Sequence, residues 1–166
     1  MSDLLGHVTS ISGSQMTADL EGNVELSSLR IGTTVKVPGT KRHTIGAISA
    51  VSVETSPAKR VLVADLVGEL VEEGGQTLFL RGVSHYPIPG APVHKAGDDD
   101  LKAIYHKPSV PSLKVGTLYD DPNTPAYVLI EDLLTKHFAV LGTTGTGKTS
   151  FWISLSLLNR PGLRRL

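Results

Sequence analysis

The stretch HFAVLGTTGTGKTSFW occupies residues 137–152 and contains the most specific pattern of the chain. Its residues 138–141 form a short apolar run, which suits a strand buried on both faces. Residues 142–149 read GTTGTGKT and match the phosphate-loop pattern G-x-x-x-x-G-K-[ST] at every fixed position. The apolar run 151–158 predicts a helix, which Pro161 and Gly162 would end. The pattern indicates a strand, a phosphate-binding loop and a helix, in that order.

The residue types of this loop have physical roles in phosphate binding. Glycines accept backbone angles that a side chain forbids, so successive N–H groups can turn inward around a phosphate. Lys148 would place its ammonium near the β- and γ-phosphates, and the Thr149 hydroxyl would complete a Mg²⁺ shell. The N-terminus of the following helix would add the positive end of its dipole. The predicted nucleotide-binding residues are Gly142, Thr143, Thr144, Gly145, Thr146, Gly147, Lys148, Thr149 and Ser150, with Thr149 also a Mg²⁺ ligand. A glycine-rich turn that binds nothing is the alternative, and the flanking strand and helix argue against it.

Composition sets the outer limits. The 166 residues suffice for one domain, or for a small domain and part of another. Hydrophobic content of 40% and charged content of 19% are typical of a soluble globular protein. The absence of cysteine excludes disulfides and thiolate metal sites and fits a reducing compartment. We find neither a secretory signal nor an apolar run of the ~18 residues that a membrane helix needs. The expected location is the cytoplasm, without a membrane partner.

Charged residues give no sign of a nucleic-acid surface in this chain. The 16 basic and 16 acidic residues cancel, whereas a domain that tracks DNA is usually clearly basic. Small basic clusters at 41–43, 59–60 and 164–165 are interpreted as solvated loop faces. Three aspartates at 98–100 raise the question of a metal site, but consecutive helical residues do not converge on one ion. They are better explained as acids in the first turn of a helix over 97–106.

The first ninety residues predict β-structure. Turn signals recur between β-prone runs, at residues 12–14, 21–23, 38–39, 56–57 and 74–75. Alternate residues from Ile45 to Val53 are expected on one face of a strand, and 61–67 is apolar on both faces apart from Asp65. Residues 72–76 predict a hairpin into a strand over 77–80. Short strands without a long amphipathic helix indicate a small β-barrel over residues 1–93.

The chain changes character after this barrel. Residues 86–93 are too proline-rich for a central strand and are interpreted as an exit segment. Residues 94–114 are expected to hold the helix and a linker. Two strands over 115–119 and 126–130 would then open the truncated N-terminal part of a phosphate-loop domain, residues 115–166. The predicted fold class is therefore mainly β, a barrel followed by the start of an α/β domain.

These features together resemble a known family. A small N-terminal barrel is followed by PIPGAPV at 87–93, VGTL at 115–118 and EDLLTKHFAVLGTTGTGKTS at 131–150. In this order they resemble the HerA-type hexameric DNA-translocating ATPases, relatives of the FtsK DNA pumps. The resemblance runs over nearly the whole chain, and the block 136–149 carries its specific part. It implies a barrel of the kind shared with rotary ATP synthases and a RecA-like ATPase domain.

The resemblance also implies a function for the parent protein. Six subunits would form a ring that drives double-stranded DNA through a central pore in end processing, repair or phage defence. ATP and Mg²⁺ would bind at residues 142–149, and a nuclease partner of the NurA type would sit on the barrel face. Only 17 residues follow Thr149. The family's second acidic motif, its interface arginine and its DNA-contacting pore loops come later than that.

We therefore expect an N-terminal piece of such an ATPase, with no catalytic residue within this chain and no hydrolysis by the piece alone. Two alternatives are a rotary-ATPase-like subunit and a stand-alone barrel that serves only as an interaction module. The apolar helix 151–158 is expected to pack on another copy or on the barrel, and the piece to self-associate.

Overall fold

The computed structural model describes residues 4–55, 58–118 and 121–135. The chain divides into two compact units, residues 1–104 and 105–166. The elements of the first unit are β1 (Leu4–Ser12), β2 (Gln15–Leu20), η1 (Leu26–Ser28), β3 (Thr34–Val37), β4 (Arg42–Thr55), β5 (Ala58–Glu73), β6 (Gln76–Arg81), β7 (Pro92–Lys95) and α1 (Asp98–Ile104). The described elements of the second unit are β8 (Ser112–Thr117), β9 (Pro125–Leu129) and α2 (Ile130–Thr135).

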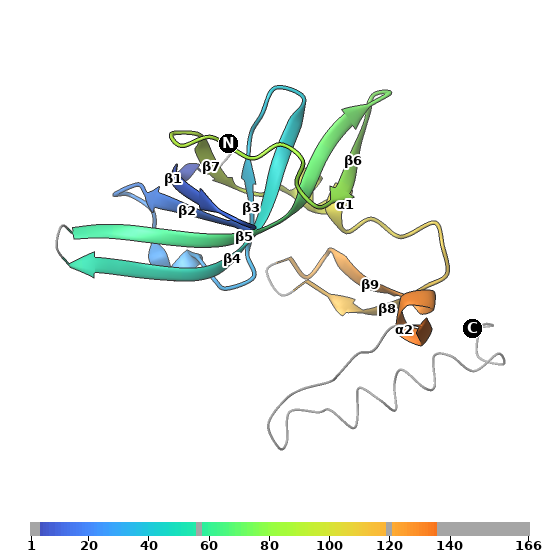
Figure 1. Cartoon of the computed structure of the whole chain (residues 1–166). Coiled ribbons are helices and arrows are strands. Elements are labelled where there is room, and N and C mark those ends of the chain that lie inside the picture. The colour runs from blue at the N-terminus through green and yellow to red at the C-terminus, as the bar shows by residue number, and fades with distance from the viewer. Residues whose placement is uncertain (1–3, 56–57, 119–120, 136–166) are drawn as a thin grey trace, which may run out of the picture. The chain divides into compact units, whose positions relative to one another are not determined.

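Six strands of the first unit close into a barrel (Figure 1). Their order is β2-β1-β7-β3-β4-β5, and β5 pairs again with β2, so that the ring has no open edge. Each pairing is antiparallel. Closure satisfies the edge groups that would otherwise be left unpaired. The mainly β fold and the closed barrel predicted from the sequence are confirmed.

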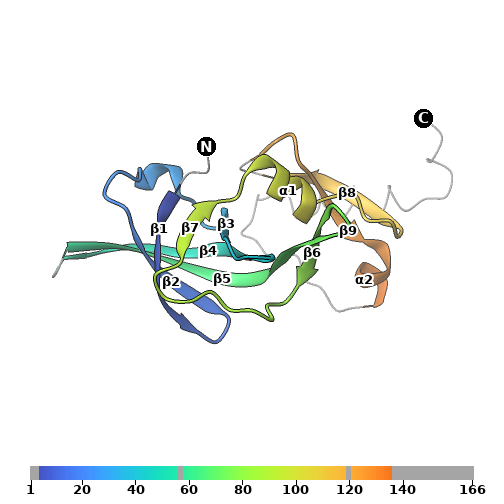
Figure 2. The same ribbon diagram turned by 90° about the horizontal axis from the view of Figure 1, so that it is seen from above.

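Strand β5 is long enough to serve two partners on one edge. Its residues 61–65 pair with β2 and complete the barrel, while its residues 68–73 pair with β6. Along its other edge β5 follows β4 almost from end to end. Figures 1 and 2 show the far end of the β4–β5 pair projecting beyond the other strands as a two-stranded arm. The predicted hairpin from β5 into β6 is confirmed.

Apolar side chains of the inward faces fill the barrel. The largest fully buried members of the core are Met16, Ile48, Leu62, Val8, Val35 and Val93. They come from β1, β2, β3, β4, β5 and β7, so every strand of the ring contributes to one core. Burying each large aliphatic side chain contributes roughly 1.5–3 kcal/mol. The core therefore explains why these short strands are stable together although none would be so alone.

The register of β4 differs from the expected simple alternation. Two register shifts interrupt its pairing with β5: Val67 is an extra residue of β5 opposite Ile45 and Gly46, and Ser49 is an extra residue of β4 between Ile48 and Ala50. Ile48 lies in the core, whereas Val53 is exposed. The prediction that alternate residues from Ile45 to Val53 share one face was wrong, because the extra residue Ser49 reverses the alternation along β4, and Val51 packs against the core whereas Ile45 does not.

The expected exit segment ends inside the barrel. Residues 92–95 form β7, which lies between β1 and β3 and provides the buried side chain of Val93. Pro92 is the first residue of this strand, a position where a missing N–H is tolerated. Proline content alone therefore underestimated how far the barrel extends.

Helix α1 is tied to the outer face of the barrel. Lys36 alternates with the core residues Val35 and Val37, so it points outward. Its Nζ lies 2.7 Å from Oδ2 of Asp100 on α1. The same carboxylate accepts the N–H of Gly97 at 2.9 Å, at the start of the helix. Asp99 instead projects into solvent and pairs with Lys102. The helix predicted near 97–106 is confirmed, and Asp100 acts as an N-terminal acceptor and ion-pair partner.

A second, smaller apolar layer lies on this outer face. Ile45 and Leu70 are buried, although neither belongs to the barrel core. Ile45 pairs with Gly68 across β4 and β5, and Leu70 pairs with Phe79 across β5 and β6. Helix α1 also contacts β5 and β6. The layer depends on Gly68, because a Cβ there would lie 2.5 and 2.6 Å from the Phe79 ring and closer still to the Leu80 carbonyl oxygen.

We predict that Gly68→Ala destabilises the first unit by about 1–3 kcal/mol, because the Phe79 ring and β6 must move to admit the methyl group. Urea unfolding followed by circular dichroism measures the change. Gly22→Ala is the matched control, since a Cβ at Gly22 meets nothing within 4 Å. Equal stability of the two variants would contradict the packing argument.

The described part of the second unit is a hairpin followed by one short helix. Strands β8 and β9 pair antiparallel, and α2 follows β9 directly. The two strands predicted near 115–119 and 126–130 are confirmed, with β8 beginning at Ser112. The RecA-like α/β domain beyond α2 lies outside the described residues and stays a prediction. No helix in the described ranges is long and apolar enough to cross a membrane.

Candidate functional site

The predicted nucleotide-binding residues lie outside the part of the chain that the structure describes. This applies to all residues from Gly142 to Ser150, including Lys148 and the predicted Mg²⁺ ligand Thr149. The strand expected at 138–141 and the helix expected at 151–158 also lie outside it. Their roles remain as predicted from the motif. The described residues show the hairpin and helix that precede it.

Local hydrogen bonds hold the hairpin that precedes the phosphate loop. Asp121 lies in the turn between β8 and β9, where its carboxylate accepts the N–H of Asn123 at 3.0 Å and the hydroxyl of Thr124. Leu118 N–H donates to the Thr124 carbonyl at 2.9 Å and closes the hairpin end. Asp121 thus acts as an Asx-type turn residue. These two hydrogen bonds stabilise the turn, which is a structural role.

Helix α2 begins where the hairpin ends. The N–H of Ile130 donates to the carbonyl of Pro111 at 3.1 Å, which ties the helix start to the residue before β8. Glu131 and Asp132 occupy its first turn, where acids complement the positive end of the helix dipole. The helix ends at Thr135, one residue before the block 136–149 that carries the family resemblance. The hairpin and α2 are thus the described elements adjacent in sequence to the predicted nucleotide site.

The most unusual polar group in the described residues is the carboxylate of Glu69. Its residue is 1% exposed and lies on the inward face of β5, opposite Thr44. The N–H groups of Ser84 and His85 each donate to Oε1 at 2.6 Å. The Ser84 hydroxyl donates to the same carboxylate at 3.0 Å, and Arg42 Nη1 donates to Oε2 at 2.9 Å. These contacts join β5 to β4 and to the loop that follows β6.

This environment determines the charge of Glu69. Burial raises the pKa of the carboxyl, but the hydrogen bonds from His85, Arg42 and Ser84 stabilise the ionised form and outweigh it. The net effect lowers the pKa from 4.5 to about 2. A carboxylate so acidic and so fully hydrogen-bonded is a poor general base at neutral pH. Glu69 therefore anchors the loop that follows β6.

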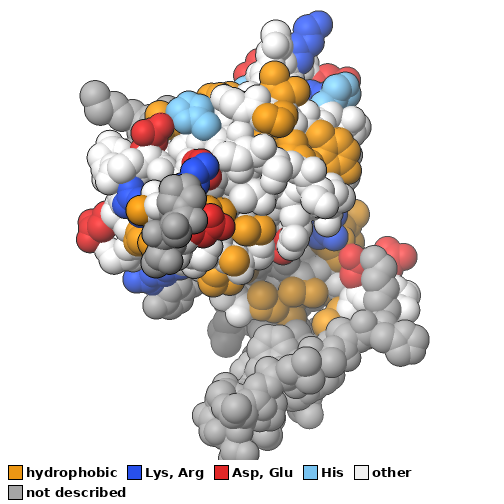
Figure 3. All heavy atoms as spheres, turned by 60° about the vertical axis from the view of Figure 1, so that its left-hand side comes forward, with side chains coloured by type: hydrophobic (Ala, Val, Ile, Leu, Met, Phe, Trp, Pro, Cys, Tyr) orange, Lys and Arg blue, Asp and Glu red, His pale blue; other side chains and the backbone are white. Residues whose placement is uncertain are grey.

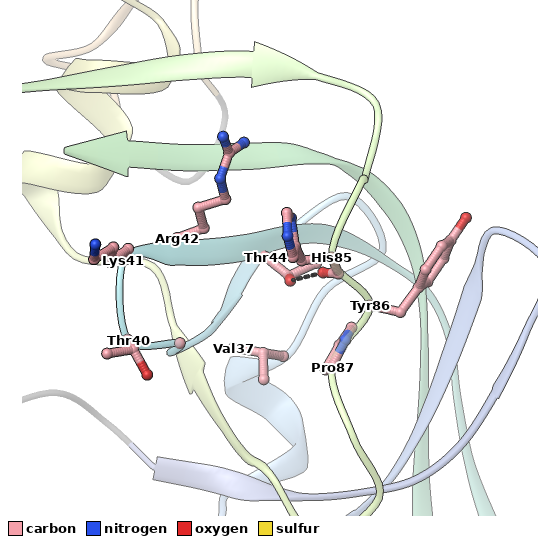
Figure 4. Close-up of a pocket in the computed structure, with 9 residues that line it drawn as sticks. Val37, Thr40, Lys41, Arg42, Thr44, His85, Tyr86 and Pro87 are labelled. Atoms are coloured by element: carbon pink, nitrogen blue, oxygen red, sulfur yellow. Dashed lines mark hydrogen bonds between the residues drawn. The ribbon is translucent and has the colours of Figure 1, made fainter. Parts of the chain in front are cut away.

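A pocket of about 480 Å³ lies beside this anchor (Figure 4). Residues of the β3–β4 connection and of the loop after β6 face each other across it. The hydroxyl of Thr44 donates to the His85 carbonyl at 3.2 Å and joins the two sides. The residues that line the pocket are Val37, Gly39, Thr40, Lys41, Arg42, Thr44, His85, Tyr86 and Pro87.

Sequence reasoning did not identify this pocket or its anchor. It noted Asp65 as the exceptional carboxylate of an apolar strand, and that side chain accepts a hydrogen bond from Gln15 near the surface. Glu69 stands in the equally apolar run LVGELV at 66–71, and this run is the feature of the sequence from which a buried carboxylate could have been predicted. A lone acid among apolar strand residues indicates a buried charge that needs partners. The partners themselves could not be read from the sequence.

Charges of both signs are mixed on the surface. The face in Figure 3 carries acidic and basic side chains interspersed, without a continuous basic track. On this face the picture agrees with the balanced composition of 16 basic and 16 acidic residues. Among the described residues, no group of three or more His, Cys, Asp or Glu side chains is arranged to hold a metal ion.

Comparison with known proteins finds a family match in the C-terminal part of the chain. Residues 113–159 match the family described as the central domain of helicase HerA. The DNA double-strand break repair helicase HerA of Pyrococcus furiosus is 39% identical over 61 residues, which are 37% of this chain and 10% of that protein. An uncharacterized protein of Aquifex aeolicus is 33% identical over 98 residues, which are 55% of this chain and 34% of that protein. The resemblance to the HerA type predicted from the sequence is confirmed over this segment.

Proposed function

We propose that this HerA-type chain is the N-terminal part of an ATP-dependent translocase or helicase that acts on double-stranded DNA in end processing, repair or phage defence. The observation that carries the proposal is the complete phosphate-loop motif at 142–149, which falls inside the segment 113–159 that matches the HerA central domain. The matches support an ATPase or helicase type of function in general. The DNA-processing role is the further step that we propose.

The proposed nucleotide chemistry follows from the motif. The backbone N–H groups of residues 142–147 would surround the phosphates of ATP. Lys148 would neutralise charge on the β- and γ-phosphates, and Thr149 would coordinate Mg²⁺ through its hydroxyl. The Ser150 side chain would follow at the start of the helix. Hydrolysis additionally requires a group that orients the attacking water and a cation that stabilises the transition state. We infer that this chain contributes binding and that further parts of the parent protein contribute turnover.

The proposed assembly is a homo-oligomeric ring, hexameric in the parent, with double-stranded DNA bound through parts other than this chain. The closed barrel would serve ring assembly and the docking of a nuclease or effector partner. Its mixed surface charge supports this division of roles, because a DNA track would need an excess of Lys and Arg. The chain spans 10% and 34% of the two relatives that it matches, which leaves room in the parent for the DNA-contacting parts.

We predict that the chain binds a fluorescent ATP analogue in the presence of Mg²⁺, and that Lys148→Ala weakens this binding at least about tenfold. The loss of one charge-assisted contact to phosphate accounts for a change of this size. Fluorescence anisotropy with and without EDTA measures it. Lys114→Ala, which removes an exposed lysine on β8, is the matched control. Binding that ignores both Lys148 and Mg²⁺ would rule out the phosphate loop as the site and favour the stand-alone barrel.

A further inference from the structure

The segment between β6 and β7, residues 82–91, presents large apolar side chains on a fixed backbone. We call it the mouth loop. Tyr86 is 54% exposed and Ile88 is 72% exposed. Their loop is nevertheless held at both ends, by Glu69 at Ser84 and by the hydrogen bond from Gly90 N–H to the Val8 carbonyl at 2.7 Å. Pro87 and Pro89 restrict the backbone between these anchors. The barrel gains little stability from apolar groups left in water, so the fixed position of Tyr86 beside the pocket calls for another explanation.

The pocket beside the mouth loop has a distinctive chemistry. Its apolar side is formed by Val37, Tyr86 and Pro87. Figure 4 shows Lys41 and Arg42 on the β3–β4 side of the pocket, away from Tyr86. None of its nine lining residues is acidic. Because the Glu69 carboxylate compensates the charge of Arg42, the remaining positive charge at the pocket is that of Lys41.

The two cations are differently engaged. Arg42 donates a hydrogen bond from Nη1 to Glu69, and its side chain remains 38% exposed. The other N–H groups of the guanidinium can therefore still donate to a ligand. Lys41 is exposed, and its ammonium makes no ion pair with any residue in the described ranges. A ligand with carboxylates would therefore meet one cation fixed in place by Glu69 and one that is available. Fixing Arg42 in advance lowers the entropy cost of binding.

We propose that this pocket docks a short acidic segment of a partner protein, which seats one apolar side chain against Val37, Tyr86 and Pro87 and places carboxylates beside Lys41 and Arg42. An apolar wall next to cations fits a peptide that carries both kinds of group. A phosphate backbone would satisfy the cations but leave the apolar wall in water. Neither the pocket nor the mouth loop contains a residue of the phosphate loop, so this proposal stands or falls separately from nucleotide binding.

The test uses a defined probe and the whole chain. The probe is an N-terminally labelled octapeptide composed of Asp, Glu, Leu and Phe, and its reference is the same peptide with Asn and Gln in place of the acids. Fluorescence anisotropy at low salt is expected to show the acidic peptide binding about tenfold more tightly, with an affinity that falls as salt rises. Equal binding of the two peptides, or no binding of either, would overturn the proposal.

Variants locate the binding on the molecule. Lys41→Glu and Tyr86→Ser are each expected to weaken the acidic peptide about tenfold, through charge reversal and through loss of the aromatic wall. Lys107→Glu makes the same charge change at another exposed lysine, and Ile88→Ser removes an exposed apolar group of the same loop that does not line the pocket. Both controls are expected to bind as the unmodified chain does. Thermal unfolding confirms that all four variants fold.

Two results would count against the site. Weakening by Lys107→Glu as large as that by Lys41→Glu would show that the effect is nonspecific charge. Binding of a twelve-base-pair duplex that competes with the peptide and is lost in Lys41→Glu but kept in Tyr86→Ser would show a phosphate contact instead. Nucleotide binding measured on the same variants is expected to be unchanged, which separates this result from the proposed ATPase role.

Discussion

Replacing Glu69 with glutamine is expected to lower the free energy of unfolding of the barrel by about 3 kcal/mol at neutral pH. The side chain is 1% exposed, and its ionised form accepts hydrogen bonds from Ser84, His85 and Arg42. Glutamine would present an amide N–H₂ to some of these donors and would leave the Arg42 charge without its partner. Urea unfolding followed by circular dichroism measures the change. Glu72→Gln, at an exposed position of the same strand, is the matched control and is expected to change stability by less than about 0.5 kcal/mol.

The same group predicts a pH dependence with a definite sign. The pKa of Glu69 is about 2 in the folded chain, below its ordinary value of 4.5, so the unfolded state binds the proton more readily. The stabilisation is therefore complete above about pH 4.5 and is lost as the pH falls toward 2. Its full size, for a pKa difference of this magnitude, is about 3 kcal/mol. In Glu69→Gln the loss of stability over this range should be smaller by that amount, while Glu72→Gln should follow the unmodified chain.

A barrel held by Glu69 as described cannot tolerate the glutamine without cost. If Glu69→Gln and Glu72→Gln unfold at the same urea concentration at pH 7, the anchor contributes nothing to stability. If the two variants lose stability in parallel between pH 4.5 and 2, the low pKa belongs to another group.

Truncating Leu62 to alanine is expected to cost about 3 kcal/mol, within the range of 2–5 kcal/mol found for buried Leu→Ala changes. Leu62 is 0% exposed and lies opposite Ala18 of β2 and Val51 of β4. It therefore packs at the seam where β5 meets β2 and closes the ring. The loss combines the removed apolar surface with the cavity left in a core that every barrel strand lines.

The matched control for Leu62 is Leu80→Ala on β6. Leu80 is 47% exposed and belongs to the strand that lies outside the closed ring. Its truncation is expected to cost less than about 1 kcal/mol. Thermal or urea unfolding of both variants gives the comparison. A similar cost for the two would mean that the β2–β5 seam is not the close-packed centre of the barrel.

The sequence alone determined the features that depend on neighbouring residues. The phosphate-loop motif is a contiguous run, and the resemblance to the HerA type is confirmed over 113–159. Short β-prone runs separated by Gly, Pro and Asn turns predicted a barrel, because such turns and alternations act within a few residues. The hairpins β5–β6 and β8–β9 and the helix α1 were predicted for the same reason.

The tertiary structure decided the features that depend on residues far apart in the chain. Strand β7 follows a proline-rich segment, and it is a strand because β1 and β3 provide partners on both sides. Strand β4 pairs with β3 through residues 44–47 and with β5 along its whole length, and its extra residue Ser49 lies just beyond the β3 pairing. The pairing partners of β7 and β4 cannot be identified from the local sequence pattern. For this reason the sequence predicted an exit segment in place of the start of β7, and a simple alternation in place of the interrupted one in β4.

Glu69 illustrates the same division at the level of one side chain. The sequence shows that Glu69 stands in an apolar run, but it does not show which groups stabilise its buried charge. The donors that stabilise it come from Ser84, His85 and Arg42, which lie 15, 16 and 27 residues away along the chain. A buried charge is tolerated only where such donors converge, and their convergence is a property of the closed barrel. The sequence by itself therefore determined the nucleotide motif and the kind of fold, while the anchor and its neighbouring pocket required strands that only the folded chain brings together.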